Sequence, residues 1–284
     1  MSSRKLAIVI TSWVFLTALA VPLVETALSD DATSTPPGAD KVAPANNLAP
    51  LSPKRIVDTN ATIESLKSSD RRTRLRAASD VAKLGGDAKK AVPALITMLQ
   101  DDDVSLQEAA ATALGTIGPN AKDALAPLIE ALDRDPEVRS AAIVAIAEIG
   151  AEAKPAAPAL RGLLKKTDDR VVLQAAVALH ALAEEDQACR IALTQLLESK
   201  EPRVRQGAAR ELGTYRQLAT DSIPALLSVL KDHSARGYVR EAAVQALGEI
   251  SPADPEVKEA LVAALKDNRR SVQEAAEAAL KKIR

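Results

Sequence analysis

The sequence predicts an all-α fold, an α-solenoid of about seven antiparallel two-helix repeats, preceded by an apolar N-terminal export or anchor helix and a disordered linker. Two observations lead to this class. The 284 residues include only one Trp, two Tyr and one Phe, so the core must be aliphatic, and the abundant Ala, Leu, Glu, Lys and Arg favour helix over strand. A thirteen-residue pattern also returns at intervals of 32 to 35 residues, which is typical of helical repeats.

Residues 1–27 are expected to be a signal peptide or an N-terminal membrane anchor. Arg4 and Lys5 precede residues 6–24, which carry no charge, and Glu25 follows. Basic residues before such a stretch and acidic residues after it place the start of the chain inside and the remainder outside. These 19 uncharged residues are also long enough to span a bilayer. Cleavage and retention therefore both stay open, and a buried core helix is a third alternative.

Residues 28–55 are predicted to form a disordered linker rich in Pro and Ala. The prolines that interrupt any helix there are Pro36, Pro37, Pro44, Pro50 and Pro53. A stretch with so little apolar surface cannot offset the entropy lost on ordering. We therefore expect an extended tether between the N-terminal segment and the repeat domain, residues 56–284.

The repeated unit is clearest in residues 138–150, VRSAAIVAIAEIG. Its fifth position is alanine in all seven copies, and its ninth position is always aliphatic. The copies begin at Thr73, Leu106, Val138, Val171, Val204, Val239 and Val272. Positions 1, 5, 9 and 12 lie within one narrow stripe of a helix. Each copy therefore predicts a helix with a single apolar face.

A second apolar segment precedes the copies, as in AVPALITML and SIPALLSVL, and predicts the first helix of each pair. Prolines near its start, such as Pro93 and Pro158, are tolerated in a first helical turn. In five copies an acid stands three residues before position 1, where its oxygen can cap the second helix. These acids are Asp70, Asp103, Asp135, Asp168 and Glu201. Two such helices cannot enclose a core alone, so stacked pairs must bury one another's faces.

The succession P-A-L-x-x-L-L, an acidic turn and V-R-x-x-A-A-x-A-L-G-x-I-G resembles the HEAT-like repeats, a class also found in phycobilin lyases. The resemblance covers residues 56–284 and implies that the second helices line a concave surface. It also implies a ladder between the turn acids and the arginines at position 2, which are Arg74, Arg139, Arg205 and Arg240. Val172 interrupts these arginines, and Arg236 and Arg269 replace two of the acids, so the ladder is expected to be incomplete.

The outward-facing flanks of the first and the last repeat are polar. Positions 4 and 8 face the preceding repeat and are Arg76 and Asp80 in the first copy, whereas positions 6 and 10 are Glu277 and Lys281 in the last. Terminal repeats need polar outer flanks for solubility. We therefore expect the array to begin and end within these residues.

A hypothetical partner-binding patch lies in the middle of the array. Positions 3 and 7 point away from the core and are polar in most copies, but Val144, Leu173 and Val177 are apolar there, and His180 stands nearby at position 10. Exposed apolar clusters rimmed by polar groups often bind partners. The alternatives are that neighbouring side chains cover the cluster and that His180 is an ordinary polar substitution at a half-exposed site.

A second candidate is Tyr238, in the turn KDHSARGY of the sixth copy. This turn is two residues longer than the common spacing and displays His233, Arg236 and Tyr238 at one edge. Insertions in solenoids map to loops on one face and can recognise partners. A tolerated neutral insertion is the alternative.

No catalytic residue, metal site or cofactor is predicted. Two histidines and one cysteine supply too few ligands for a zinc or iron–sulfur site, and Cys189 is expected to be a packing residue. Iron-binding HEAT-repeat hydroxylases use His-Glu pairs, whereas His180 and His233 are each followed by another residue type. Lys and Arg number 37 against 38 for Asp and Glu, so no basic excess favours a nucleic acid.

The sequence therefore predicts a non-catalytic scaffold or adaptor that binds a protein partner through the concave face of the solenoid. It is expected to work outside the cytoplasm, in a periplasmic or extracellular location, with membrane contact only through an uncleaved N-terminal segment. Two alternatives stay open. One is a subunit of a chromophore lyase-like enzyme, which the resemblance permits, and the other is a purely structural spacer.

Overall fold

The computed structural model describes residues 59–183 and 186–282. The predicted N-terminal segment and linker lie outside the described residues. Within the described ranges, none of the helices combines the length and the apolar character needed to cross a bilayer.

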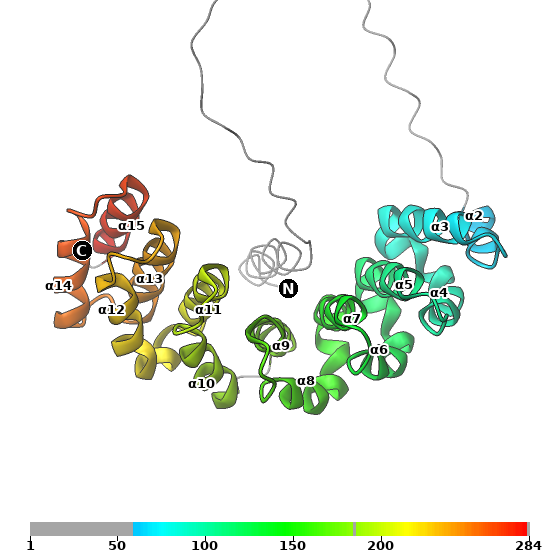
Figure 1. The fold of residues 1–284 in the computed structure, drawn as a ribbon, viewed down its shortest axis with the longest axis horizontal. Helices are drawn as coiled ribbons and strands as arrows, with labels where there is room; N and C mark the ends of the chain where they lie inside the picture. The colour runs from blue at the N-terminus through cyan, green and yellow to red at the C-terminus, as the bar shows by residue number, and fades with distance from the viewer. Residues whose placement is uncertain (1–58, 184–185, 283–284) are drawn as a thin grey trace, which may run out of the picture.

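The described chain is a curved stack of helix pairs, as predicted (Figure 1). The first helices of the pairs form the outer row and are α2 (Thr59–Leu66), α4 (Val92–Leu99), α6 (Leu125–Ala131), α8 (Ala157–Leu163), α10 (Gln187–Leu196), α12 (Ile223–Lys231) and α14 (Pro255–Ala264). The second helices form the inner row and are α3 (Arg71–Leu84), α5 (Val104–Ile117), α7 (Pro136–Ile149), α9 (Asp169–Ala181), α11 (Pro202–Thr214), α13 (Gly237–Ile250) and α15 (Arg270–Lys281). The inner row lines the concave side of the arc, as the family resemblance implied.

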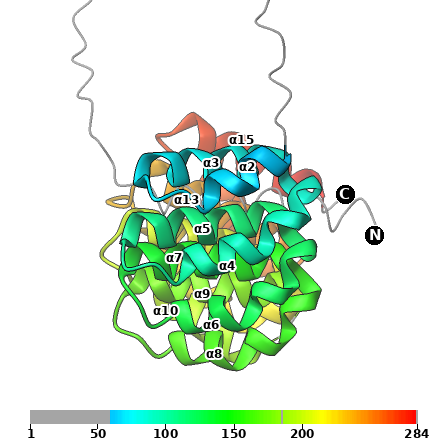
Figure 2. The same cartoon turned by 90° about the vertical axis from the view of Figure 1, so that its right-hand side faces the viewer.

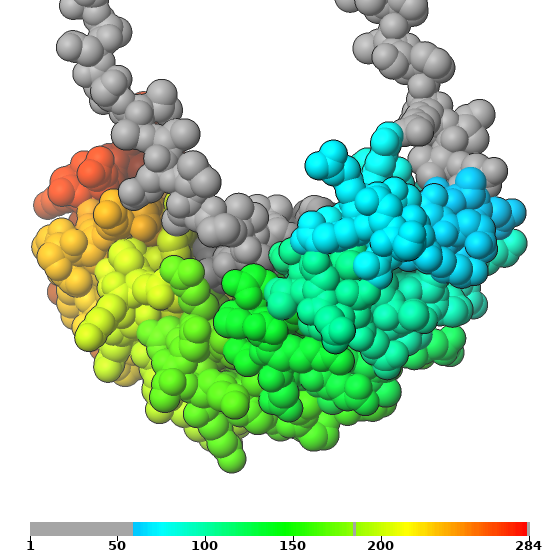
Figure 3. All heavy atoms as spheres, turned by 45° about the vertical axis from the view of Figure 1, so that its right-hand side comes forward, coloured from blue at the N-terminus to red at the C-terminus, as the bar shows by residue number. Residues whose placement is uncertain are grey.

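Successive pairs lie in parallel layers when the stack is viewed from its N-terminal side (Figure 2). Their packed side chains form one continuous curved body (Figure 3). Every alanine at position 5 of the pattern is buried, and so is every aliphatic residue at position 9 except Leu280, which lies half-buried on the last helix. Ala142 and Ile146 are fully buried. The apolar stripe read from the sequence therefore forms a single aliphatic spine.

Small residues at positions 8 and 10 let neighbouring inner helices approach closely. A methyl group built on Gly115 of α5 would lie 3.0 Å from the Ala145 Cα of α7, and one on Gly213 of α11 would lie 3.0 Å from the Ala246 Cα of α13. Contacts this short leave no room for a larger side chain without moving one helix. The spacing of the stack is thus set by these small residues.

Short 3-10 helices join the pairs, which the sequence analysis did not anticipate. They are η1 (Gly85–Ala91), η2 (Gly118–Ala124), η3 (Gly150–Ala156) and η4 (Arg216–Ser222). Gly85, Gly118 and Gly150 begin the first three with φ of 56°, 66° and 71°. The fourth begins with Arg216, which adopts a φ of 52° although side chains disfavour this region.

Three of the five predicted caps are confirmed. The carboxylates of Asp70, Asp103 and Asp168 accept backbone N–H groups at the starts of α3, α5 and α9. Asp135 and Glu201 make no side-chain cap, and the Glu201 carboxylate instead accepts a hydrogen bond from Arg170 at 2.7 Å. Capping acids therefore serve two purposes, closing a helix or joining neighbouring repeats.

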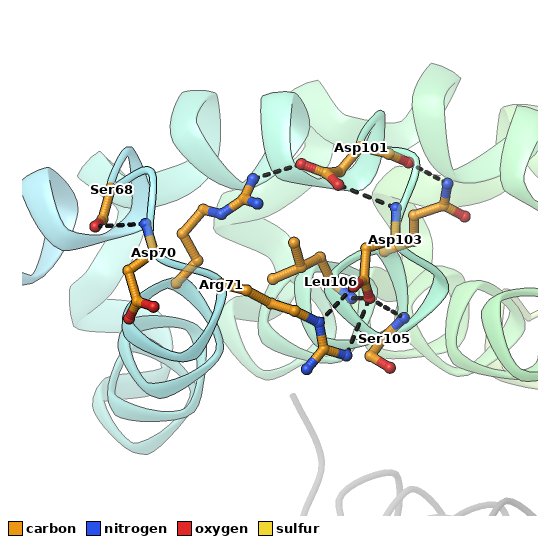
Figure 4. Close-up of polar contacts among 9 residues, drawn as sticks. Ser68, Asp70, Arg71, Asp101, Asp103, Ser105 and Leu106 are labelled. Carbon is orange, nitrogen blue, oxygen red and sulfur yellow. Dashed lines mark hydrogen bonds and ion pairs between the residues drawn. The ribbon is translucent and has the colours of Figure 1, made fainter.

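The predicted ladder exists, but it uses different acids from those expected (Figure 4). Arg74 of α3 pairs with Asp101 in the next turn, five residues before position 1, and not with the capping Asp103. The capping Asp103 pairs with Arg71, which lies outside the repeated pattern. Asp101 also accepts the Asp103 N–H at 3.0 Å, which holds the turn in place.

The same pairing recurs near the C-terminal end. The ladder is nevertheless incomplete, as expected, because Arg139 and Arg205 donate to backbone carbonyls and not to acids. Arg240 of α13 donates from Nε and Nη2 to the two carboxylate oxygens of Asp267, each at 2.8 Å. The side chains of Arg240 and Asp267 are only 2% and 3% exposed. The hydrogen bond from Arg240 lowers the pKa of the Asp267 carboxyl from its ordinary value of 3.8. Where no arginine is available, as at Val172 of α9, Ser199 instead donates to Asp169 across the repeats at 2.5 Å.

Replacing Arg216 with glycine should raise the free energy of unfolding by about 1 kcal/mol, because glycine adopts a positive φ without the clash that a side chain meets. The opposite change, Gly150→Ala, should lower it by about 1–2 kcal/mol, since a Cβ there meets no atom within 4 Å and only the backbone conformation is penalised. Urea unfolding followed by circular dichroism measures both. A free energy of unfolding that falls in Arg216→Gly would contradict the assignment of strain at Arg216.

Replacing Arg240 with methionine should cost about 3–5 kcal/mol of unfolding free energy at neutral pH, because the buried Asp267 charge loses its partner. The pKa of Asp267 is lowered in the folded chain, so its contribution is present above pH 3.8 and is lost as the pH falls through the folded value. The deficit of the variant should therefore shrink below pH 3.8. Arg270→Met is the matched control, because its pair with Glu274 is exposed and contributes little. A deficit unchanged by acid would contradict the role of the Asp267 charge.

Candidate functional site

The predicted site residues fall in two separate places. Val144 lies on α7, and Leu173, Val177 and His180 lie on the neighbouring helix α9, all in the inner row. Tyr238 lies at the start of α13, two inner helices further along. The structure therefore brings four of the five residues together and leaves Tyr238 apart.

The apolar cluster is buried and not exposed as the sequence analysis expected. Leu173 and Val177 are 1% and 8% exposed and belong to the continuous aliphatic cluster, and Val144 is half-buried against it. The prediction of an open apolar surface is wrong for Leu173 and Val177, while their role in binding a partner stays a prediction.

The cluster differs from the rest of the concave side. Glu108 and Thr112 of α5, and Arg210 and Gln245 further along, occupy the equivalent positions 3 and 7 and are exposed. Ser140, Val144, Leu173 and Val177 carry no charge and form what we call the central strip. Gln174 donates to Ser140 Oγ at 2.7 Å and joins α9 to α7 beside the strip.

His180 is held by residues of the following repeat. Its Nδ1 lies 2.6 Å from Glu211 Oε1 and 3.2 Å from Thr214 Oγ1. Its ring stacks on Tyr215 with centroids 4.5 Å apart and an interplanar angle of 23°. The His180 side chain is 21% exposed and that of Glu211 is 6% exposed. His180 is thus part of an interface between repeats and is held there by three neighbours.

His180 and Glu211 stand at the positions where α5 and α7 have small residues that let the two helices approach closely. His180 stands at position 10 of its copy and Glu211 at position 8 of the next, where α5 and α7 place Gly115 and Ala145. Because two long side chains fill the contact, α9 packs less closely against α11 than α5 packs against α7. His180 stands out in the sequence, whereas its partners Glu211 and Tyr215 were not predicted. The signal available in the sequence was that Glu211 occupies position 8, where most copies have a small residue.

Two further ionisable groups lie near this interface, the Cys189 thiol and the Tyr215 phenol. Cys189 of α10 is fully buried, as predicted for a packing residue, and burial raises the pKa of its thiol to about 12. It is therefore protonated at neutral pH and unsuited to nucleophilic attack. Burial also raises the pKa of the Tyr215 phenol. Among the described residues, no three His, Cys, Asp or Glu side chains converge as a metal ion would require.

Tyr238 is fixed to the wall of the solenoid. The Arg203 Cζ lies 4.7 Å from the centroid of its ring, a cation–π contact between the fifth and sixth repeats. Tyr238 is half-buried, whereas His233 and Arg236 of the same turn are exposed. The inserted turn thus displays His233 and Arg236, and the ring of Tyr238 joins the repeats.

Comparison with known proteins identifies the architecture. A family model described as HEAT repeats matches residues 59–136, 119–183 and 191–281. The YibA protein of Escherichia coli superposes with a TM-score of 0.57 at 19% identity, over 79% of this chain and 81% of that chain. A HEAT-like repeats protein of the archaeon Thermococcus onnurineus NA1 gives 0.52 at 16% identity, over 80% and 97%.

An engineered protein of known structure is also similar, with a TM-score of 0.54 at 27% identity over 80% of this chain and 68% of that chain. A search of curated proteins finds no match. The two natural structures show the same fold, and their similarity extends no further than the fold.

A double-mutant cycle should detect the contact between His180 and Glu211. His180→Ala and Glu211→Ala remove one partner each, and the coupling energy should be about 0.5–3 kcal/mol, as for other contacting residues. The measurement is urea unfolding of the single and double variants. The same cycle on Glu108 and Gln245, which are exposed on separate helices, is the control and should give additive effects. Additivity at His180 and Glu211 would show that their contact contributes nothing to the interface.

Proposed function

Because the chain belongs to the HEAT repeat family, we propose that it is a non-catalytic scaffold or adaptor that binds a protein partner through its concave face, outside the cytoplasm. The observation that carries the proposal is the inner row of helices. It lines the concave side from the first repeat to the last, and positions 3 and 7 of the pattern bring exposed side chains to it in several repeats. A surface repeated in this way suits an extended segment or the side of a globular domain.

The concave side carries polar side chains that can make hydrogen bonds and ion pairs, and the helices that bear them are held in fixed positions. Glu108, Arg210 and Gln245 are exposed along it and come from three different repeats. The buried pair between Arg240 and Asp267 and the contacts between small residues hold these helices in place. Tight interfaces usually depend on Trp, Tyr and Arg anchors. With so few aromatic residues, this surface favours a partner bound with modest affinity.

The proposal of a non-catalytic role rests on the chemistry of the His180 imidazole and the Cys189 thiol. The His180 imidazole is bound to Glu211 and stacked on Tyr215, and the Cys189 thiol is protonated. Such groups stabilise the interface between repeats. The proposal of a location outside the cytoplasm rests on Arg4, Lys5 and the uncharged residues 6–24.

Site-specific photo-crosslinking tests partner binding. A photoreactive amino acid at Thr112 or Gln245, both exposed on the inner row, should crosslink the same protein in the native cell. The matched control is Gln195, exposed on α10 of the outer row, which should not crosslink that protein. Identical products from all three positions would argue against the concave face, and no product from either concave position would favour a structural spacer.

Protease accessibility tests the location. In intact cells with a permeable outer boundary, added protease should degrade the repeat domain while a cytoplasmic marker survives, because residues 6–24 direct everything after them outward. Survival of the repeat domain until the membrane is broken would contradict export.

A further inference from the structure

The turns that join the two helices of each pair lie along one edge of the stack, which we call the turn edge, and the 3-10 linkers lie along the opposite edge. This follows because the pairs succeed one another in the same sense. Neighbouring turns contact each other, as where Arg134 donates to the Leu99 carbonyl at 2.7 Å, so the edge is one connected surface. It consists of residues 67–70, 100–103, 132–135, 164–168, 197–201, 232–236 and 265–269.

The exposed charges of the turn edge differ in sign between its two ends. The exposed acids of the second and third turns are Asp102, Asp133 and Asp135, and the exposed bases of the sixth and seventh turns are Arg236, Lys266 and Arg269. None of these side chains forms an ion pair within the part of the chain that the structure describes. Asp232 is the exposed acid of the sixth turn, and its carboxylate accepts the backbone N–H and the hydroxyl of Ser234.

The arginines of the turn edge do not serve the helices that they precede. Arg236 and Arg269 are the N-cap residues of α13 and α15, and neither side chain caps its helix. The first five copies carry an acid at this position. An acid can accept the N–H groups of the first turn and complements the helix dipole, whereas a cation opposes it. The fold alone favours an acid at both positions, which points to a role for the arginines outside the fold.

We propose that the turn edge is the contact surface for a second copy of this chain, related by a two-fold axis that passes between the fourth and fifth repeats. Such an axis places the second turn of one chain against the seventh turn of the other, and the third turn against the sixth. The helix pairs form an arc that curves in one direction (Figure 1), so the rotation lays one arc over the other with the turn edges facing. The first repeat has no counterpart and extends beyond the contact.

The two-fold arrangement brings opposite charges together at equivalent positions of the turns. Asp135 and Arg236 both stand three residues before position 1 of their copies, so they face each other across the contact. In the second turn Asp102 stands one residue earlier and faces Arg269 of the seventh turn. The symmetry forms each pair twice, once on either side of the axis.

The fourth and fifth turns face each other next to the axis. Lys165 and Glu198 both stand six residues before position 1 of their copies and are exposed, so they form a further pair of opposite charges. Asp168 and Glu201 also approach each other there. Asp168 caps α9, and Glu201 accepts a hydrogen bond from Arg170 at 2.7 Å. Both carboxylates are therefore already engaged within their own chain.

The charge balance of the whole chain permits this contact. Lys and Arg number 37 and Asp and Glu number 38, so two copies approach each other without strong net repulsion. Exposed ion pairs contribute little individually, so the dimer depends on several pairs acting together and on the ionic strength. Both concave faces stay open in this arrangement. The inference is therefore separate from the binding of a partner to the concave face.

Sedimentation equilibrium of the full-length protein in a density-matched non-ionic detergent measures the association. At an ionic strength of about 0.01 M, where charges act over about 30 Å, we expect twice the 29.8 kDa mass of one chain. At about 1 M, where this range falls to about 3 Å, we expect the mass of one chain. A single chain at the lower ionic strength overturns the proposal. A dimer that persists at the higher one places the contact elsewhere, and masses above two chains contradict the two-fold symmetry.

Charge reversal tests the pairing itself. Chains with Arg236→Glu and Arg269→Glu, or with Asp102→Arg and Asp135→Arg, should associate more than about 100-fold more weakly, because like charges then face each other. An equimolar mixture of the two variants should recover the dimer, since every contact again joins opposite charges. A mixture that stays monomeric contradicts the proposed pairs.

Lys122→Glu with Lys154→Glu is the matched control, because both lysines are exposed on the linker edge and the change in net charge is the same as for the two arginines. This variant should dimerise as the unaltered protein does, and equal dissociation would show that net charge and not the turn edge governs association. The arginine substitutions introduce an acid where it favours the helix N-terminus. Far-UV circular dichroism should therefore show a folded chain.

Crosslinking through cysteine gives a second measurement that needs no charge reversal. Chains with Asp135→Cys mixed with chains with Arg236→Cys should be joined by a short bismaleimide at low ionic strength. Within one chain the two positions lie three repeats apart, about 25–30 Å at 8–10 Å for each step between helices, and Cys189 is fully buried. Asp135→Cys chains alone should stay uncrosslinked. An uncrosslinked mixture, or equal crosslinking of Asp135→Cys chains with one another, contradicts the arrangement.

Discussion

The close approach of the inner helices is the constraint on which the rest of this structure depends. Alanine at position 5 and glycine or alanine at positions 8 and 10 let one backbone lie against the next, as at Gly115 and Ala145. The inner row is thereby drawn together, while leucines such as Leu95 and Leu128 fill the space toward the outer row. A stack that is narrow on one side and wide on the other must curve. The concave face is thus a consequence of side-chain size.

One interface departs from this rule, and its chemistry follows from the departure. His180 and Glu211 are too large for the contact that small residues make elsewhere, so α9 and α11 stay further apart and polar groups fill the gap. Buried polar groups must find hydrogen-bond partners, and the hydroxyl of Thr214 and the ring of Tyr215 complete the cluster. The inner helices of the fourth and fifth repeats are therefore joined by directional contacts at the position where α5 and α7 are joined by the close packing of Gly115 and Ala145.

Periodicity predicted the helix pairs and the buried stripe, because these depend only on the spacing of apolar residues, whereas the concave orientation of the second helices was implied by the family resemblance. It did not predict which acid completes the ladder. Asp101 and Asp103 are two residues apart, and the geometry of the turn decides that Arg74 reaches the first. Nor could spacing show that Leu173 and Val177 are covered, because a pattern gives the direction of a side chain and not what lies against it. The 3-10 linkers depend on backbone angles, such as φ at Gly118, that composition only suggests.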